Sequence, residues 1–432
     1  MTTSKAATAP ARNSKNDVDL DYWTHHIVPI LSSLLKSAGS YSPADQDAHI
    51  RALSEYVLPN LGPRPSVAHT RSFLTQTGSP FQPSINLNSE KPQVRYCWEL
   101  LGPHGGSDSD PLGVEAAREI LSYLSTAFGF CTRWSDAWLS AFAPTVEEAK
   151  ELQVKLPRWL SSVIPAGAEV PSLKRLPFVF VAFDLSGPKT SIKAYFNPKA
   201  KEIVTGEPAT DVTWNVLRSL TPSLNAASID VLEQFLAERA VPGTVELVGV
   251  DCVDEASLSD ARVKIYVYTW NNSFNTVRDY VTLGGLLQDK TTLKGLAILR
   301  DIWHLLLQEP EGLDDDYNKP VNDNSIFYQK LYFSFEMRPG REFPEVKTYL
   351  PTWNYVRSDE ATVQNYEEIF RKCGYELGDK GRYRKLFESA FGPVNHNRQI
   401  PVHCDASFLY SEKKGTYQTL YFSPPLGEEE YM

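Results

Sequence analysis

Hydrophobic residues recur every three or four positions along much of the chain, which is the spacing of one helix face. A helix is predicted from Pro43, because Ser42 and Asp45 have capping-box spacing and proline is favoured in the first turn. The periodicity predicts further helices over residues 21–39, 113–129, 145–163, 208–220, 228–240, 292–307, 361–373 and 382–390.

Short segments rich in β-branched and aromatic residues lie between these helices in pairs. They predict strands over residues 178–185, 191–198, 244–250, 261–270, 330–337, 346–351, 404–410 and 416–424. The gaps within a pair are short, which favours antiparallel pairing, since a parallel crossover needs about a dozen residues or more. No long linker divides the chain, so we expect one domain over residues 17–428 after a disordered tail over residues 1–16.

Four predicted strands carry cationic and phenolic side chains at alternate positions, so each set faces one side of the sheet. One such pair is typical of a solvated strand face. Four sets in a chain of net charge −10 favour a shared internal site. The sets are Lys193 and Tyr195; Arg262, Lys264 and Tyr266; Lys347 and Tyr349; and Tyr417 and Tyr421.

A chamber lined by these side chains suits a diphosphate that ionises to a carbocation. Arginine and lysine bind diphosphate oxygens. Phenol faces stabilise a cation by about 0.5–2 kcal/mol per contact, and they exclude the water that would quench it.

Composition narrows the possible partners. The net charge of −10 argues against a nucleic-acid partner. Five scattered cysteines without a CxxC pair predict neither a disulfide framework nor a zinc site, and they indicate a reducing, cytoplasmic compartment. We see no signal peptide and no segment near the roughly 20 apolar residues of a membrane span. We therefore expect no membrane partner, and a monomer or a homodimer.

Several features superficially resemble ligand motifs. The acidic segment 312–323 lacks DDxxD spacing, because Asn318 and Lys319 stand where an aspartate is needed to bind Mg²⁺. The glycine-rich segment 102–113 lacks the spacing of a nucleotide-binding loop. Three histidines in predicted helices are expected to be packing or surface residues: His25, His26 and His304.

Six segments taken together resemble the fungal dimethylallyltryptophan synthase family of indole and aromatic prenyltransferases. They are residues 79–88, 94–103, 183–206, 261–285, 335–351 and 416–424. The resemblance implies an α+β, single-domain ABBA-type prenyltransferase barrel of about ten antiparallel strands ringed by helices. It implies electrophilic transfer of a dimethylallyl group from dimethylallyl diphosphate, a co-substrate, to an indole acceptor, with no metal cofactor.

The resemblance also implies roles for individual residues. It implies that four residues bind the diphosphate: Arg95, Lys193, Arg262 and Lys264. Lys347 occupies one further polar position at the diphosphate site. The tyrosine shield it implies comprises Tyr195, Tyr266, Tyr349, Tyr417 and Tyr421.

Three departures from the family pattern lie at the acceptor end. Gln82 replaces a glutamate that accepts the indole N–H, and a glutamine oxygen still accepts that bond. Members that use free tryptophan carry a lysine, proposed as proton acceptor, at Ser186 and a carboxylate-binding arginine at Gly249. We therefore expect an acceptor pocket with Gln82 and Ser186 that takes a tryptophan-derived cyclic dipeptide or a larger indole alkaloid. The base is not identified, and Gln82→Glu is expected to raise activity.

Three alternatives stay open. In the first, the acceptor is a phenol or a tyrosine derivative rather than an indole. In the second, the barrel carries an apolar ligand without catalysis, although burying four cations without an anion is costly. The third is a diphosphate-dependent cyclase, which the lack of an aspartate-rich box disfavours.

Overall fold

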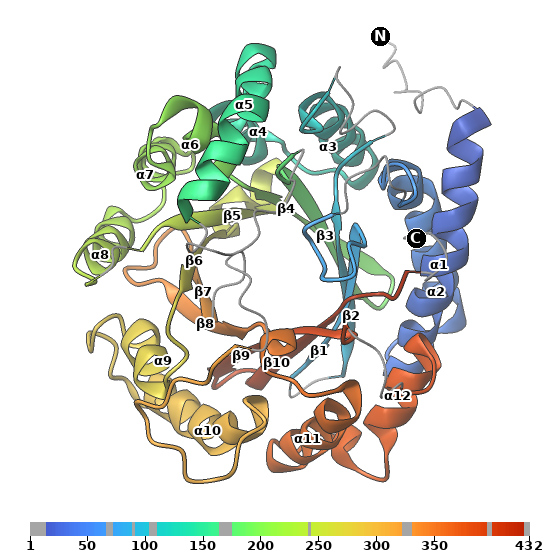
Figure 1. Ribbon diagram of the computed structural model, residues 1–432, viewed down its shortest axis with the longest axis vertical. Helices are drawn as coiled ribbons and strands as arrows, with labels where there is room; N and C mark the ends of the chain where they lie inside the picture. Colours follow the sequence, from blue (N-terminus) through green and yellow to red (C-terminus); the bar gives the residue numbers. More distant parts are fainter. Residues whose placement is uncertain are drawn as a thin grey trace.

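The computed structural model describes residues 14–65, 72–88, 91–102, 110–163, 175–240, 243–321, 331–394 and 400–426. Ten strands form one closed barrel in which every neighbouring pair is antiparallel, and helices surround it (Figure 1). This confirms the predicted α+β barrel. The strands are β1 Phe81–Leu87, β2 Gln93–Glu99, β3 Val179–Ser186, β4 Lys189–Phe196, β5 Val245–Cys252, β6 Val263–Thr269, β7 Leu331–Met337, β8 Glu345–Leu350, β9 His403–Ser411 and β10 Gly415–Phe422.

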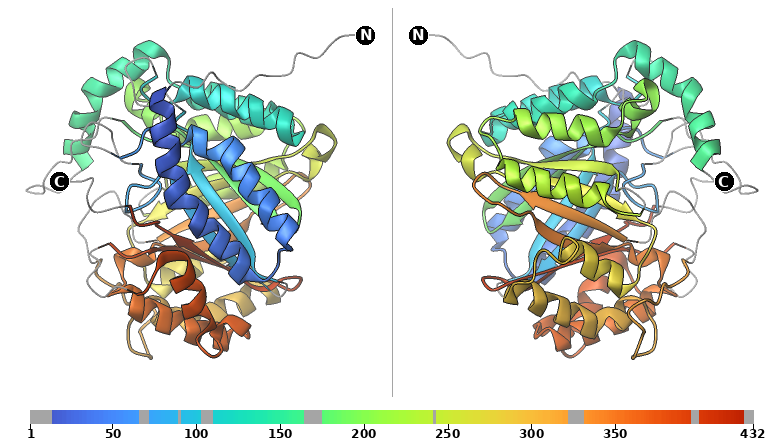
Figure 2. Two further views of the ribbon diagram at one scale, coloured as in Figure 1. Left: turned by 90° about the vertical axis from the view of Figure 1, so that its right-hand side faces the viewer. Right: turned by 90° about the vertical axis from the view of Figure 1, so that its left-hand side faces the viewer.

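Helices of the described residues pack against the outside of this barrel, as the side views show (Figure 2). Short 3-10 or π turns at Leu53–Val57, Leu58–Asn60, Glu255–Asp260, Thr352–Asn354 and Glu376–Gly378 complete the helical structure of these residues. The α-helices are α1 Ser14–Ala38, α2 Pro43–Ala52, α3 Val114–Phe128, α4 Arg133–Phe142, α5 Val146–Val163, α6 Lys199–Thr205, α7 Ala209–Ser219, α8 Ala226–Ala237, α9 Phe274–Val281, α10 Lys290–Leu306, α11 Asp359–Lys372 and α12 Arg382–Phe391.

Strand alternation separates two environments. In β6, Val263, Ile265 and Val267 are fully buried in the hydrophobic core. Lys264 and Tyr266, the residues between them, line an internal cavity instead. The core therefore lies between the barrel and its helices, and the barrel interior is left for polar and aromatic side chains.

The predicted capping box of α2 is present. Ser42 Oγ accepts a hydrogen bond from the Asp45 backbone N–H, and the Asp45 carboxylate accepts one from the Ser42 N–H. Most of the predicted 1–16 tail lies outside the described residues, but α1 begins at Ser14.

The hydrophobic pattern predicted eight of the ten strands and missed β1 and β2, and the resemblance implied about ten strands without assigning these two. Apolar and polar residues do alternate along β1, but the strand contains Pro83, which has no backbone N–H for the sheet and argues against a strand in the sequence. The pattern also missed α4 and the short helices α6 and α9.

Candidate active site

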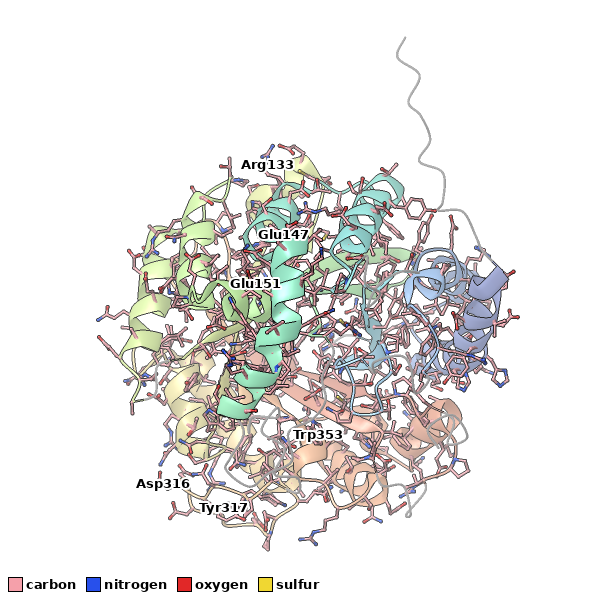
Figure 3. The ribbon with its side chains drawn as sticks, turned by 45° about the horizontal axis from the view of Figure 1, so that its top comes forward. Arg133, Glu147, Glu151, Asp316, Tyr317 and Trp353 are labelled. Atoms are coloured by element: carbon pink, nitrogen blue, oxygen red, sulfur yellow. The ribbon has the colours of Figure 1, made fainter. Side chains whose placement is uncertain are left out.

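The barrel encloses a cavity of about 1620 Å³ to which all ten strands contribute side chains. Helix α5 lies across one end of the barrel, where its Trp159 and Val163 line the cavity. Figure 3 shows this helix from the same end, with Glu147 and Glu151 along it and Trp353 below it. Trp353 also lines the cavity.

The structure brings eleven predicted site residues into this one cavity, although their roles toward a substrate stay predictions. They are Gln82, Arg95, Lys193, Tyr195, Arg262, Lys264, Tyr266, Lys347, Tyr349, Tyr417 and Tyr421.

Ser186 does not lie in the cavity, which corrects its predicted place in the acceptor pocket. It is the last residue of β3, is exposed, and pairs with Lys189 at the β3–β4 hairpin. The β3 residues that line the cavity are Phe180, Ala182 and Asp184. Ser186 has the same strand parity, but it lies beyond the edge of the cavity.

Arg95 and Lys193 share the carboxylate of Asp184. Lys193 forms an ion pair with Asp184, and Arg95 Nε lies 3.5 Å from Asp184 Oδ1. Burial alone would raise the pKa of Asp184, but the two cations outweigh burial and hold this pKa far below its ordinary value. Arg95 also donates to the Tyr417 hydroxyl and to Gln93 Oε1.

Arg262 and Lys264 are held by Asp251 and Glu336. Arg262 binds Asp251 through two nitrogens, with Nη2 2.9 Å from Oδ1. Lys264 Nζ lies 3.3 Å from Glu336 Oε2, and Arg338 Nη2 lies 2.7 Å from Glu336 Oε1. These carboxylates hold the cationic side chains in place at the cavity wall.

Lys347 differs from these cations because no carboxylate among the described residues lies within ion-pair distance of it. Its Nζ lies 3.4 Å from Thr419 Oγ1 and over the rings of Tyr349 and Tyr417, at 5.2 and 4.8 Å from their centroids. The side chain is 7% exposed. Burial, followed by repulsion from Lys264 and other cations, holds the pKa of Lys347 well below its ordinary value. A bound anion would stabilise the charged form of Lys347 and so offset both effects.

The tyrosines form a continuous layer. The Tyr266 ring lies 6.1 Å from that of Tyr195 and 5.8 Å from that of Tyr349, and the Tyr349 ring lies 6.3 Å from that of Tyr421. Tyr332 stacks on Tyr349 at 4.6 Å.

Sequence reasoning missed several residues of this site. Tyr268 and Tyr332 line the cavity, and Tyr268 could have been found because it shares strand parity with Tyr266. Three carboxylates that pair with the cations could not have been found in this way, because each pairs with a residue on a neighbouring strand. They are Asp184, Asp251 and Glu336.

The acceptor end contains a short polar chain. Gln82 Nε2 donates to the Leu74 carbonyl at 3.2 Å and contacts Cys404 Sγ at 3.3 Å. Cys404 Sγ donates to Asp405 Oδ2 at 2.8 Å. Both contacts use the amide nitrogen of Gln82, which leaves its oxygen available to accept a hydrogen bond.

The structure places most of the segments that superficially resemble ligand motifs. Asp315 pairs with Arg278 and Arg300. His25 and His26 lie on α1, and His304 lies on α10. Most of the 102–113 segment lies outside the described residues.

Across the described ranges, no group of three or more His, Cys, Asp or Glu side chains has an arrangement that would hold a metal ion. No helix in that part of the chain is long and apolar enough to span a membrane.

The model of the tryptophan dimethylallyltransferase family matches residues 19–385. The chain belongs to this family. Among its relatives, the indole diterpene prenyltransferase terF of Tolypocladium album is 70% identical over 428 residues, which cover 99% of each chain. The indole diterpene prenyltransferase ltmF of Epichloe festucae var. lolii is 53% identical, covering 96% of this chain and 94% of the relative. Family membership confirms the predicted resemblance and makes the chain a prenyltransferase.

A solved structure shares the architecture of this prenyltransferase. AnaPT from Neosartorya fischeri superposes with a TM-score of 0.79 at 26% identity, covering 94% of each chain.

Proposed function

We propose that this prenyltransferase transfers a dimethylallyl group from dimethylallyl diphosphate to the indole ring of an indole diterpene. The observation that carries the donor assignment is Lys347, a buried lysine without a carboxylate partner in the described structure, among further cations. A diphosphate supplies the charge that this cluster lacks.

Two observations support a large acceptor. The cavity volume of about 1620 Å³ exceeds the roughly 300–1,000 Å³ of common small-molecule pockets. The similar relatives named above are indole diterpene prenyltransferases. Gly249 provides no cation for an amino-acid carboxylate, which argues against free tryptophan.

The proposed mechanism is an electrophilic aromatic substitution. Five side chains stabilise the charge that develops on the departing diphosphate as the allylic C–O bond breaks: Arg95, Lys193, Arg262, Lys264 and Lys347. The allylic cation lies against the tyrosine layer, and the indole ring attacks it to form a C–C bond. The Gln82 oxygen orients the acceptor. Because the side chains neutralise the diphosphate, the transfer requires no divalent metal ion.

The test is incubation of the purified chain with dimethylallyl diphosphate and a panel of acceptors, read by mass spectrometry. The panel contains an indole diterpene, a tryptophan-containing cyclic dipeptide, free tryptophan and a tyrosine derivative. We expect the indole diterpene to gain one dimethylallyl unit with the highest kcat/KM. Preference for the tyrosine derivative would support the phenol alternative, and no transfer to any acceptor would contradict the proposal.

A further inference from the structure

Strand β9 contains an extra residue beside the cavity. Ala406 pairs with Leu420 and His403 pairs with Phe422, so Cys404 and Asp405 together lie opposite Tyr421. Such a bulge interrupts the alternation of side chains between the two faces of a strand.

The bulge separates Asp405 from His403: Asp405 keeps the parity of Leu409 and Ser411, which also line the cavity, whereas His403 is turned outward. In a regular strand, His403 and Asp405 would point to the same side. Here His403 stacks on Phe387 at 4.7 Å and bonds Asp359 and Tyr383 outside the barrel. Asp405 lines the cavity. Bulges are common next to active sites because they redirect a side chain in this way.

Asp405 has a different environment from the carboxylates that hold the cationic cluster. Asp184 and Glu336 each pair with cations, whereas no lysine, arginine or histidine nitrogen of the described chain lies within 4 Å of the Asp405 carboxylate. Its neighbours are the Cys404 thiol and the Tyr332 hydroxyl. Burial raises the pKa of Asp405 to about 6. The carboxylate is therefore ionised at neutral pH, yet it is more basic than an ordinary aspartate.

The position of Asp405 suits the acceptor rather than the diphosphate. Its neighbour Ala406 pairs with Leu350, three residues along β8 from Lys347, which corresponds to about 10 Å. Cys404 links Asp405 to Gln82, and Tyr332 links it to the tyrosine layer through its stacking on Tyr349. Asp405 therefore lies beside the tyrosine layer, on the side of Gln82.

We propose that Asp405 is the base that accepts the proton from the prenylated ring carbon, an inference that rests on the proposed function. Ring attack on the allylic cation forms the C–C bond and leaves a cationic ring that still carries its hydrogen. The Asp405 carboxylate takes that proton, the C–H electron pair restores aromaticity, and the carboxylic acid returns the proton to solvent. The electron pair of the broken C–O bond has already left with the diphosphate.

Asp405→Asn tests this role because it keeps the size of the side chain and removes its basicity. We expect kcat for prenyl transfer to fall by about 100-fold or more. Release of diphosphate should continue, since the cationic cluster is intact. An acceptor deuterated at the attacked ring carbon should show a primary isotope effect that the wild type does not show, because proton removal has become rate-limiting. Asp47→Asn, which changes an exposed carboxylate on the outer helix α2, is the matched control.

The wild type provides a test that needs no variant. Because Asp405 must be ionised to act, kcat/KM should rise as pH increases through about 6. A flat profile from pH 5 to 8, or an Asp405→Asn variant with wild-type kcat and no isotope effect, would overturn the assignment. A wild type that prenylates no acceptor would instead contradict the proposed function, so the two failures are distinguishable.

Discussion

The ring of Tyr195 lies against the backbone of Gly249, and a Cβ atom at position 249 would be 2.8 Å from two of its ring carbons. The two residues are paired neighbours on β4 and β5. The absent side chain at position 249 thus allows Tyr195 to join the tyrosine layer, where its ring lies 6.1 Å from that of Tyr266.

Gly249→Ala should displace the Tyr195 ring and lower kcat, because Cβ contacts shorter than 3.0 Å are essentially never tolerated. We expect about a ten-fold loss, which corresponds to roughly 1.4 kcal/mol in the transition state. A double-mutant cycle with Tyr195→Ala measures the cause. Gly249→Ala should cost little further activity when Tyr195 is already absent, whereas additive losses would show that the two residues act separately.

Lys347→Met should lower activity and raise stability. Removing the charge weakens diphosphate binding, so we expect kcat/KM for dimethylallyl diphosphate to fall about 10- to 100-fold. Without substrate, the same change removes a buried cation that lacks a carboxylate partner in the described structure. The free energy of unfolding should therefore rise by about 1 kcal/mol. Thermal melting and initial rates check both effects. Lys385→Met on the outer helix α12 is the control and should change neither.

Lys264→Ala removes a charge from the diphosphate site, while Glu336 keeps Arg262 and Arg338 as partners. We expect a loss of about 2–4 kcal/mol in transition-state stabilisation, or roughly 30- to 1000-fold in kcat/KM. A folded variant with near wild-type turnover would show that β6 does not contact the diphosphate.

Activity should survive treatment with EDTA, because the cationic side chains neutralise the diphosphate in place of a metal ion. Initial rates before and after chelation, with Mg²⁺ added back, provide the measurement. Complete loss that Mg²⁺ restores would contradict the metal-independent mechanism.

Gln82→Glu should lower activity, which reverses the expectation from sequence. The Gln82 amide donates to the Leu74 carbonyl, and a carboxylate at this position would face that carbonyl oxygen without a proton to share. It would also lie near the Cys404–Asp405 pair and add a like charge there. We expect kcat with an indole acceptor to fall several-fold, in line with a lost bond of about 1 kcal/mol. A rate above wild type would show that the new charge favours the cationic ring more than it disturbs Leu74.

The sequence by itself determined which residue types face the barrel interior. Side chains alternate along any regular strand, so Lys264 and Tyr266 of β6, and Arg262 just before it, were expected to share a face wherever the strand was placed. Four such sets indicated an internal anionic ligand, and the resemblance supplied the family and the ten-strand barrel. These inferences were accessible because strand parity is local, and because the six segments retain the family's order.

Tertiary structure alone decided how the strands are aligned and where the cavity ends. Asp251 meets Arg262 because β5 and β6 are neighbours, and the spacing of the two residues along the chain does not reveal that pairing. Ser186 has the parity of a cavity residue, but the extent of the barrel places it outside. Between His403 and Asp405 parity itself is interrupted by one extra residue, which depends on the pairing of β9 with β10. Alternation is a property of one strand, whereas alignment, cavity limits and bulges are properties of neighbouring strands.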